Sequence, residues 1–393
     1  MEFERPAVAE IEKGMSSRVP LLQVVVGPRQ VGKSTAARQI EQRLAWSSHS
    51  ASADSALPHS PEWIETQWQL ARLKAEKGKS LLILDEVQKI RGWSEVAKRL
   101  WDEERAKKGP VRALLLGSSA LLLQKGLTES LSGRFFLHRF THWTWPECQV
   151  AFGWNLDQWI YFGGYPGAAG LADDETQWKR YVTDSLIETV LSRDVLQLQT
   201  VNKPALLRHL FALAATFPAQ ILSYTKMLGQ LQDAGNTTTL AHYLKLLESA
   251  FLASGLELFS KGKVRKRGSS PKLILWNNAL INATSLRSLA DARREGNWWG
   301  RLVENAVGAH LLNELQGPQW SITYWRDGDQ EVDFVVSHGT DIWAIEVKSG
   351  RAGKQAGVEA FRKAYPKAKV WLIGADGVKL EEFFSRPAIS WFG

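Results

Sequence analysis

The sequence predicts an α/β protein made of several domains, and three features of the chain point to that class. A glycine-rich loop at residues 27–34 lies between an apolar run and a helix-forming run. Two helix-forming segments and a strongly basic stretch follow one another over residues 223–276. Further on, apolar runs at residues 333–336 and 342–348 carry carboxylates and flank a short polar turn. A chain of 393 residues is also longer than one hydrophobic core usually supports.

The loop at residues 27–34 reads Gly-Pro-Arg-Gln-Val-Gly-Lys-Ser, which fits the pattern G-x-x-x-x-G-K-[ST]. Such a loop wraps backbone N–H groups around nucleotide phosphates at the positive end of the following helix. The alternative is a strand, turn and helix in which the glycines are only turn residues. We expect the loop to bind ATP and Mg²⁺ through Gly27, Pro28, Arg29, Gln30, Val31, Gly32, Lys33, Ser34 and Thr35.

Within this loop, the expected tasks follow from the side chains. Lys33 is expected to neutralise the β- and γ-phosphates, and the Ser34 hydroxyl is placed to ligate Mg²⁺. Gly27 and Gly32 permit backbone conformations that residues with a Cβ atom avoid.

The second half of the nucleotide site is expected at residues 80–86, an apolar run that predicts a buried parallel strand ending in two carboxylates. Asp85 suits an outer-shell contact to Mg²⁺, and Glu86 suits the general base for an attacking water. Acids also end strands for solubility alone. A third apolar strand, 111–116, leads to Ser118, whose hydroxyl is expected to sense the γ-phosphate or orient the water. The polar residues 46–61 predict a loop or a weak edge strand.

This series of motifs, followed by Ser-Gly-Arg-Phe at residues 132–135, resembles the AAA-type (AAA+) ATPases. In those rings an arginine before an aromatic residue reaches the neighbouring subunit's nucleotide site. The resemblance therefore implies that Arg134 is an arginine finger, with Arg139 in reserve, and that the chain assembles into a ring, expected to be hexameric. A surface salt-bridge arginine is the alternative. Arg193, beyond the core, is expected to be either a second nucleotide sensor or a partner in a surface ion pair.

Residues 205–285 are expected to form a winged-helix domain. Helices are predicted at 223–232 and 237–252, the second with Thr237 as its N-cap, and strands at 256–259 and 272–276. Five cations in the loop between these strands suit the DNA backbone, and two outward residues of the second helix join them in the expected nucleic-acid set: Lys261, Lys263, Arg265, Lys266, Arg267, His242 and Lys245. The alternatives are a solvated basic loop and a module that only packs subunits together.

The apolar runs near the end of the chain predict a β-hairpin. Pairing its strands about the turn puts Asp333 opposite Glu346, with Lys348 on the same face. Two carboxylates suit Mg²⁺, and the lysine suits a base or charge stabiliser for phosphodiester hydrolysis. Together with Glu304 on a predicted helix at 300–315, this order resembles the PD-(D/E)XK nuclease fold. The alternative is a half-polar strand whose acids and lysine form ion pairs.

As a whole, the chain resembles a family of prokaryotic AAA-type ATPases that carry a winged-helix segment and a C-terminal PD-(D/E)XK-like module. The predicted domains are an ATPase core at 1–140, a helical connection at 141–204, the winged helix at 205–285 and a restriction-endonuclease-like α/β domain at 286–393. The sequence departs from related chains at Trp276-Asn277-Asn278, where they often have an aspartate.

Composition narrows the class of protein. A net charge of +8 favours an anionic partner such as DNA, and the single Cys148 fits a reducing cytosol without disulfides. No apolar run approaches the roughly 20 residues of a membrane span, so a cytoplasmic protein without a membrane partner is expected. The expected function is ATP hydrolysis coupled to an action on DNA, with branched DNA among the forms considered, and with a Mg²⁺-dependent nuclease module. The alternatives are a nucleotide-controlled protein switch with a non-cleaving C-terminal domain, and a dimeric ATPase whose nuclease is the effector.

Overall fold

The structure is a computed structural model, and it describes residues 3–55, 59–75, 78–117, 130–198, 201–231, 236–260, 270–348, 350, 356–375 and 377–392. The chain divides into two compact units, Met1–Thr141 and His142–Gly393. The predicted domain boundary after residue 140 lies beside this division. The boundaries predicted after residues 204 and 285 fall inside the second unit and stay predictions. Within the described parts of the chain, no helix is both long and apolar enough to cross a membrane.

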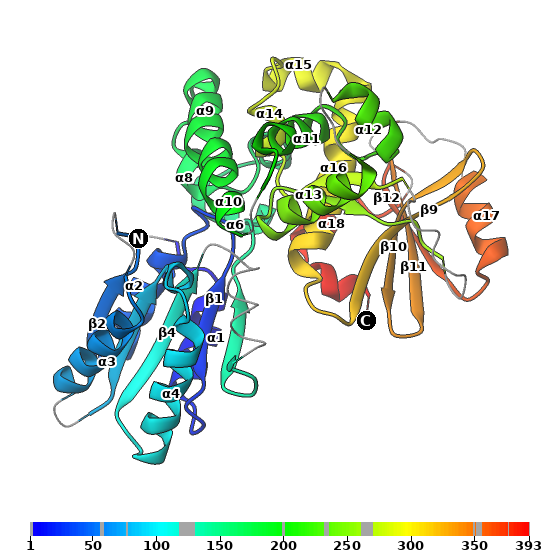
Figure 1. Cartoon of the computed structure of the whole chain (residues 1–393). Helices are drawn as coiled ribbons and strands as arrows, with labels where there is room; N and C mark the ends of the chain where they lie inside the picture. The colour runs from blue at the N-terminus through cyan, green and yellow to red at the C-terminus, as the bar shows by residue number, and fades with distance from the viewer. Residues whose placement is uncertain are drawn as a thin grey trace. The chain divides into compact units, whose positions relative to one another are not determined.

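The first unit is built on a five-stranded sheet with the strand order β2-β3-β4-β1-β5, in which every pair is parallel (Figure 1). Its strands are β1 (Leu22–Val26), β2 (Ser47–Ser52), β3 (Ser80–Asp85), β4 (Val111–Gly117) and β5 (Phe135–Arg139). Its helices are α1 (Ala7–Ser16), α2 (Lys33–Leu44), α3 (Glu62–Lys74), the 3₁₀ turn η1 (Val87–Lys89) and α4 (Trp93–Ala106). The central strands are apolar and buried, as expected where helices cover a parallel sheet.

The polar strand β2 forms one edge of this sheet, which confirms the expectation of a weak edge strand within residues 46–61. Strand β4 lies between β1 and β3, with Val26 beside Gly117 and Asp85 beside Leu116. Because the strands are parallel, their carboxyl ends meet at one edge of the sheet. The nucleotide-binding loop after β1 and the acidic end of β3 are therefore brought to the same edge.

The second unit begins with helices and contains two sheets. Its helical elements are α6 (Trp145–Phe152), α7 (Leu156–Phe162), α8 (Pro166–Ala169), α9 (Glu175–Tyr181), π-helical turns at Val182–Ile187 and Val190–Asp194, α10 (Val195–Leu198), α11 (Pro204–Thr216), α12 (Tyr224–Gln230), α13 (Thr237–Ser249), α14 (Ala279–Asn282), α15 (Leu289–Arg294), α16 (Gly296–Glu314), α17 (Ala356–Ala364), α18 (Leu380–Ser385) and the 3₁₀ turn η4 (Ala388–Trp391). The long helix α16 contacts β8 of one sheet and β11 of the other.

The smaller sheet of this unit is antiparallel, with the order β6-β8-β7, and consists of β6 (Gln220–Ile221), β7 (Ala253–Leu256) and β8 (Lys272–Leu275). Helix α13 is capped by Asn236, whose side chain accepts from the Thr239 N–H, so the expectation of a Thr237 cap was wrong. The strand expected at 256–259 also lies earlier in the chain. The reason is that residues 257–259 exchange backbone hydrogen bonds with Tyr324 instead.

The larger sheet has the order β12-β11-β10-β9 and consists of β9 (Trp320–Asp327), β10 (Gln330–His338), β11 (Asp341–Lys348) and β12 (Lys369–Gly374). Strands β10 and β11 form the predicted hairpin, and Phe334 pairs with Ile345. This register places Asp333 beside Glu346, one step along the strands. Helix α17 packs against β10 and β11, and Figure 1 shows it beside this sheet in orange.

Candidate functional site

The nucleotide-binding loop follows β1 directly, and its two glycines have different structural reasons. A Cβ atom on Gly27 would lie 1.8 Å from the carbonyl oxygen of Phe140, so only glycine fits beside the end of β5. Gly32 has a φ of 92°, a left-handed conformation that favours glycine, and it precedes the first residue of α2. Both positions therefore shape the loop through its backbone, as predicted.

Replacing Gly27 by alanine is expected to weaken ATP binding tenfold or more. The added methyl group would clash with the Phe140 carbonyl oxygen, and moving the loop or the Phe140 backbone to relieve that clash costs about 1–3 kcal/mol. A cost of about 1.4 kcal/mol corresponds to a tenfold loss of affinity. Calorimetric titration with ATP measures the loss. Gly78→Ala is the matched control, since a Cβ atom there has no neighbour within 4 Å. Equal ATP affinity in both variants would contradict the assigned role of Gly27.

Lys33 and Ser34 begin α2, and each side chain points back to the site. The Lys33 ammonium donates to the carbonyl oxygens of Gly27 at 3.0 Å and Pro28 at 2.7 Å, and the residue is only 8% exposed. The Ser34 hydroxyl donates to Asp85 Oδ2 at 3.0 Å. A hydroxyl and a carboxylate in contact at the start of a helix form an oxygen donor set that suits Mg²⁺.

Glu86 lies in a strained backbone conformation directly after β3. Its φ is 55°, which is uncommon for a residue with a side chain and often marks a functional position. Its N–H donates to Asp85 Oδ1 at 2.9 Å, and its carboxylate accepts from Gln88 Nε2 at 2.8 Å. Burial raises the pKa of Glu86, and the nearby Lys33 partly opposes that shift. A carboxylate with a raised pKa is better suited to accept a proton from water.

The two candidate arginines occupy opposite ends of β5. The carbonyl of Arg134 accepts from the Leu22 N–H where β1 begins, so Arg134 lies at the edge of the sheet away from the nucleotide-binding loop. Its guanidinium donates to both carboxylate oxygens of Asp102, at 2.9 and 3.3 Å. Arg139 ends β5 beside Val26 and is exposed, and its side chain makes no ion pair or hydrogen bond with residues that the structure describes.

The remaining predicted residues of the core and of the nucleic-acid set fall into two groups. His242 and Lys245 are exposed on α13, as predicted for outward residues of that helix, and Arg193 is exposed on a π-helical turn. Ser118 lies outside the described residues, as do the cations of the basic loop: Lys261, Lys263, Arg265, Lys266 and Arg267.

The acidic residues predicted for the C-terminal module do converge, but around a lysine that the sequence analysis missed. Lys272 is 0% exposed, and its ammonium lies 2.6 Å from Glu304 Oε1 and 3.2 Å from Asp333 Oδ1. Glu331 Oε1 also lies 3.2 Å from it. A charged residue within the otherwise apolar run 272–276 was the available signal, because a buried lysine needs anionic partners.

The other two predicted residues of this module form a pair of their own. The Lys348 ammonium lies 2.6 Å from Glu346 Oε1, while Glu346 Oε2 is buried without a hydrogen-bond partner among the described residues. Burial raises the pKa of Glu346 to about 7, and the nearby Asp333 adds to the shift. Asp333 Oδ2 accepts from the Val347 N–H at 2.8 Å, which connects the pair to the Lys272 cluster.

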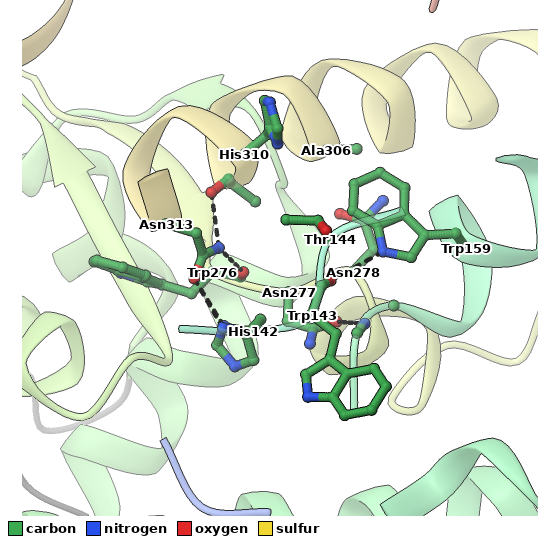
Figure 2. A pocket seen from close by; sticks show the side chains of 13 residues that line it. His142, Trp143, Thr144, Trp159, Trp276, Asn277, Asn278, Ala306, His310 and Asn313 are labelled. Carbon is green, nitrogen blue, oxygen red and sulfur yellow. Dashed lines mark hydrogen bonds between the residues drawn. The ribbon is translucent and has the colours of Figure 1, made fainter. Parts of the chain in front are cut away.

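A small cavity lies elsewhere in the second unit, where buried asparagines connect α7, α14 and α16 (Figure 2). Its volume of ≈ 30 Å³ has room for about two water molecules, not for a substrate. Asn277 Oδ1 accepts from the N–H groups of Gly164 and Ala279, and Asn278 Nδ2 donates to the carbonyls of Ile160 and Leu302. Asn277 and Asn278, which lie where related chains often have an aspartate, therefore hold α7, α14 and α16 together.

Comparisons with protein families cover most of the chain in three parts. Residues 20–148 match the AAA domain family. Residues 153–291 match a domain of unknown function, DUF8612, and residues 299–383 match another, DUF4143. No match was found among curated proteins.

Solved structures that resemble the chain do so distantly. The Aeropyrum pernix ORC1 protein in complex with DNA is 12% identical, with a TM-score of 0.31 over 73% of this chain and 92% of that chain. A variant of Thermotoga maritima RuvB is 14% identical, with a TM-score of 0.36 over 66% and 90%. The Thermotoga maritima RuvB Holliday junction branch migration motor is 14% identical, with a TM-score of 0.35 over 67% and 92%.

The family match covers the same residues that form the parallel sheet, the nucleotide-binding loop and the Asp85–Glu86 strand end. The sequence, the sheet topology and the contact between Ser34 and Asp85 agree with that assignment. Residues 20–148 of this chain are therefore similar to the AAA domain family in sequence, and the parallel sheet and nucleotide-binding loop lie within that match.

Proposed function

We propose that this protein hydrolyses ATP and couples hydrolysis to an action on DNA. The observation that carries the ATPase part is the hydrogen bond between Ser34 and Asp85, with Glu86 half-buried beside it. Ser34 lies in α2, which follows β1, whereas Asp85 ends β3, and β4 separates these two strands in the sheet. A nucleotide-binding loop that served only as a turn would not require them to meet. The arrangement instead suits a cation and a water molecule placed next to a γ-phosphate.

The chemistry follows from the positions of these side chains. Lys33 would bind the β- and γ-phosphate oxygens, and Ser34 and Asp85 would hold Mg²⁺, which when bound neutralises charge on the phosphates. Glu86 would accept a proton from water as the water oxygen bonds to the γ-phosphorus. The bond from the γ-phosphorus to the bridging oxygen breaks, and ADP carries that oxygen away. In an assembled ring, Arg134 would serve a neighbouring subunit, whereas Arg139 lies near its own loop.

The DNA part of the proposal rests on the middle segment of the chain. The element order α11, β6, α12, α13, β7 and β8 is the order of a winged helix, and His242 and Lys245 are exposed on α13. The five cations at residues 261–267 belong between β7 and β8 in the sequence. A basic stretch that closely follows an exposed helix in the sequence suits the phosphate backbone of DNA.

The test is steady-state ATP hydrolysis with and without single-stranded, duplex and four-way-junction DNA, with Lys33→Ala as the blank. We expect at least one DNA form to stimulate turnover several-fold. The charge reversal Lys245→Glu should weaken that stimulation, and Lys363→Glu, an exposed lysine on α17, is the matched control. Intact basal turnover that no DNA form changes would contradict the DNA part and leave the ATPase part standing.

A protein-directed switch with a non-cleaving C-terminal module is the second candidate, and one observation favours it. Lys272 lies among the carboxylates that the nuclease prediction assigns to Mg²⁺. Among the described residues, no group of three or more histidine, cysteine or carboxylate side chains is arranged to hold a metal ion. These residues therefore do not fit a divalent cation, and we do not extend the proposal to DNA cleavage. Metal-dependent cleavage stays a prediction from the sequence.

A further inference from the structure

We propose that Lys272 is a built-in cation that takes the place of a divalent metal in the C-terminal module. Its ammonium is expected to hold Glu304, Asp333 and Glu331 together permanently, so that the cluster stabilises the fold and binds no Mg²⁺. This inference concerns the second unit alone and does not depend on the proposed ATPase activity.

The contacts of Lys272 satisfy an ammonium group. It has three N–H donors, and its Nζ atom lies within 3.2 Å of Glu304 Oε1, Asp333 Oδ1 and Glu331 Oε1. The carbonyl oxygen of Asp333 lies 3.2 Å away as well. All of these oxygens surround one buried point, which is the position that a cation bridging Glu304 and Asp333 would need.

The charges around this point are already nearly balanced, which disfavours a second cation there. The carboxylates are Glu304, Glu331, Asp333 and Glu346, and the neighbouring cations are Lys272, Arg301 and Lys348. Three cations neutralise all but one carboxylate, whereas adding Mg²⁺ beside Lys272 would bring a doubly charged ion against a buried ammonium. Repulsion between such charges in a site shielded from water is strong.

The protonation preferences agree with this balance. Burial alone would lower the pKa of Lys272, but Glu304, Asp333 and Glu331 together raise it, so the ammonium keeps its charge. Burial acts to raise the pKa of Asp333, yet Lys272 and the Val347 N–H bring it below its ordinary value. Burial, with Asp333 nearby, raises the pKa of Glu304 to about 8.

The backbone of Lys272 is held on both sides, which fixes the point from which its side chain reaches the carboxylates. Lys272 begins β8, the central strand of its sheet, and pairs with Ile221 of β6 on one side and Leu256 of β7 on the other. Moving the ammonium away by shifting the strand would break both pairings. Lys272 is therefore anchored in the central strand of its sheet.

The experiment is a titration of the nucleotide-free full-length chain with Mn²⁺, followed by electron paramagnetic resonance of free Mn²⁺. Every variant also carries Asp85→Asn, which removes the carboxylate from the nucleotide site. In the chain with Lys272, we expect Asp333→Asn to leave the number of bound Mn²⁺ ions unchanged, because no Mn²⁺ binds at Asp333. Lys272→Gln is expected to gain one Mn²⁺ site per chain, and adding Asp333→Asn to Lys272→Gln should remove it. Lys363→Gln, an exposed lysine of the same unit, is the matched control and should gain none.

Thermal melting provides a second readout. Lys272→Gln should melt at a lower temperature than the chain with Lys272, because it leaves buried carboxylates unpaired, and Mn²⁺ should restore part of the loss. A Mn²⁺ site in the chain with Lys272 that disappears with Asp333→Asn would overturn the inference. A folded Lys272→Gln variant without Mn²⁺ binding would overturn it as well. If Lys272→Gln does not fold, the titration of the chain with Lys272 decides.

Discussion

The variant Glu86→Gln should bind ATP with unchanged affinity and hydrolyse it at least about 100-fold more slowly, since a positioned general base contributes roughly 10²–10⁴-fold. The amide keeps the size of the side chain but cannot accept the proton from water. Single-turnover hydrolysis and calorimetric ATP binding separate the two effects. Glu95→Gln, an exposed position on α4, is the matched control. Turnover within a few-fold of the unsubstituted chain would remove Glu86 from the catalytic role.

The same assignment fixes the direction of the pH dependence. A base must be deprotonated to act, and burial raises the pKa of Glu86 above the ordinary carboxyl value of 4.5. Turnover should therefore fall as the pH decreases through this raised value, at a pH where an exposed carboxylate would still be ionised. Glu86→Gln should lose this limb of the pH profile together with the activity.

The arginines should give the second large effect, and subunit mixing distinguishes their roles. Arg139→Ala is expected to lower turnover by about 10³-fold, because an arginine that stabilises charge on the γ-phosphoryl group contributes roughly 10³–10⁵. Since Arg139 lies beside its own nucleotide loop, adding Lys33→Ala subunits should not restore activity. Arg134→Ala is expected to lose less, because the guanidinium of Arg134 is bound to Asp102 within its own chain.

Mixing also tests whether Arg134 serves a neighbouring subunit. If Lys33→Ala subunits restore the activity of Arg134→Ala, Arg134 acts on a neighbour's nucleotide and is the arginine finger that the family resemblance implies. Restoration of Arg139→Ala by the same mixing would contradict its role at its own site. Analytical ultracentrifugation in the presence of ATP shows whether the mixed chains assemble at all, which the interpretation requires.

Local patterns predicted much of the first unit. The loop at residues 27–34 and the strand that ends in Asp85 are each read from consecutive residues, and the parallel sheet brings them to one edge as expected. The hairpin register of Asp333 and Glu346 was also predictable, because a short turn and a period of two residues determine it.

Contacts between distant residues were not predictable in the same way. Lys272 lies 61 residues before Asp333 in the chain, and nothing in the spacing of either motif indicates that they meet. The pairing of Arg134 with Asp102 likewise joins residues 32 apart. In both cases the packing of helices and strands decides which side chains meet. Local sequence patterns do not contain that information, although they identified the elements themselves.

The asparagine network of the second unit has a consequence for how the chain acquires its structure. Asn278 and Asn282 bond to carbonyls of α7 that lie 118 and 121 residues earlier, and His142 bonds to Asn313, 171 residues later. Bonds between residues this far apart form only after the ends of the intervening chain have been brought together. The entropy cost of closing such long loops is expected to make folding slow and cooperative. A ribosome must therefore synthesise the chain at least as far as Asn313 before all of these bonds can form, and apolar segments that are exposed until then favour aggregation.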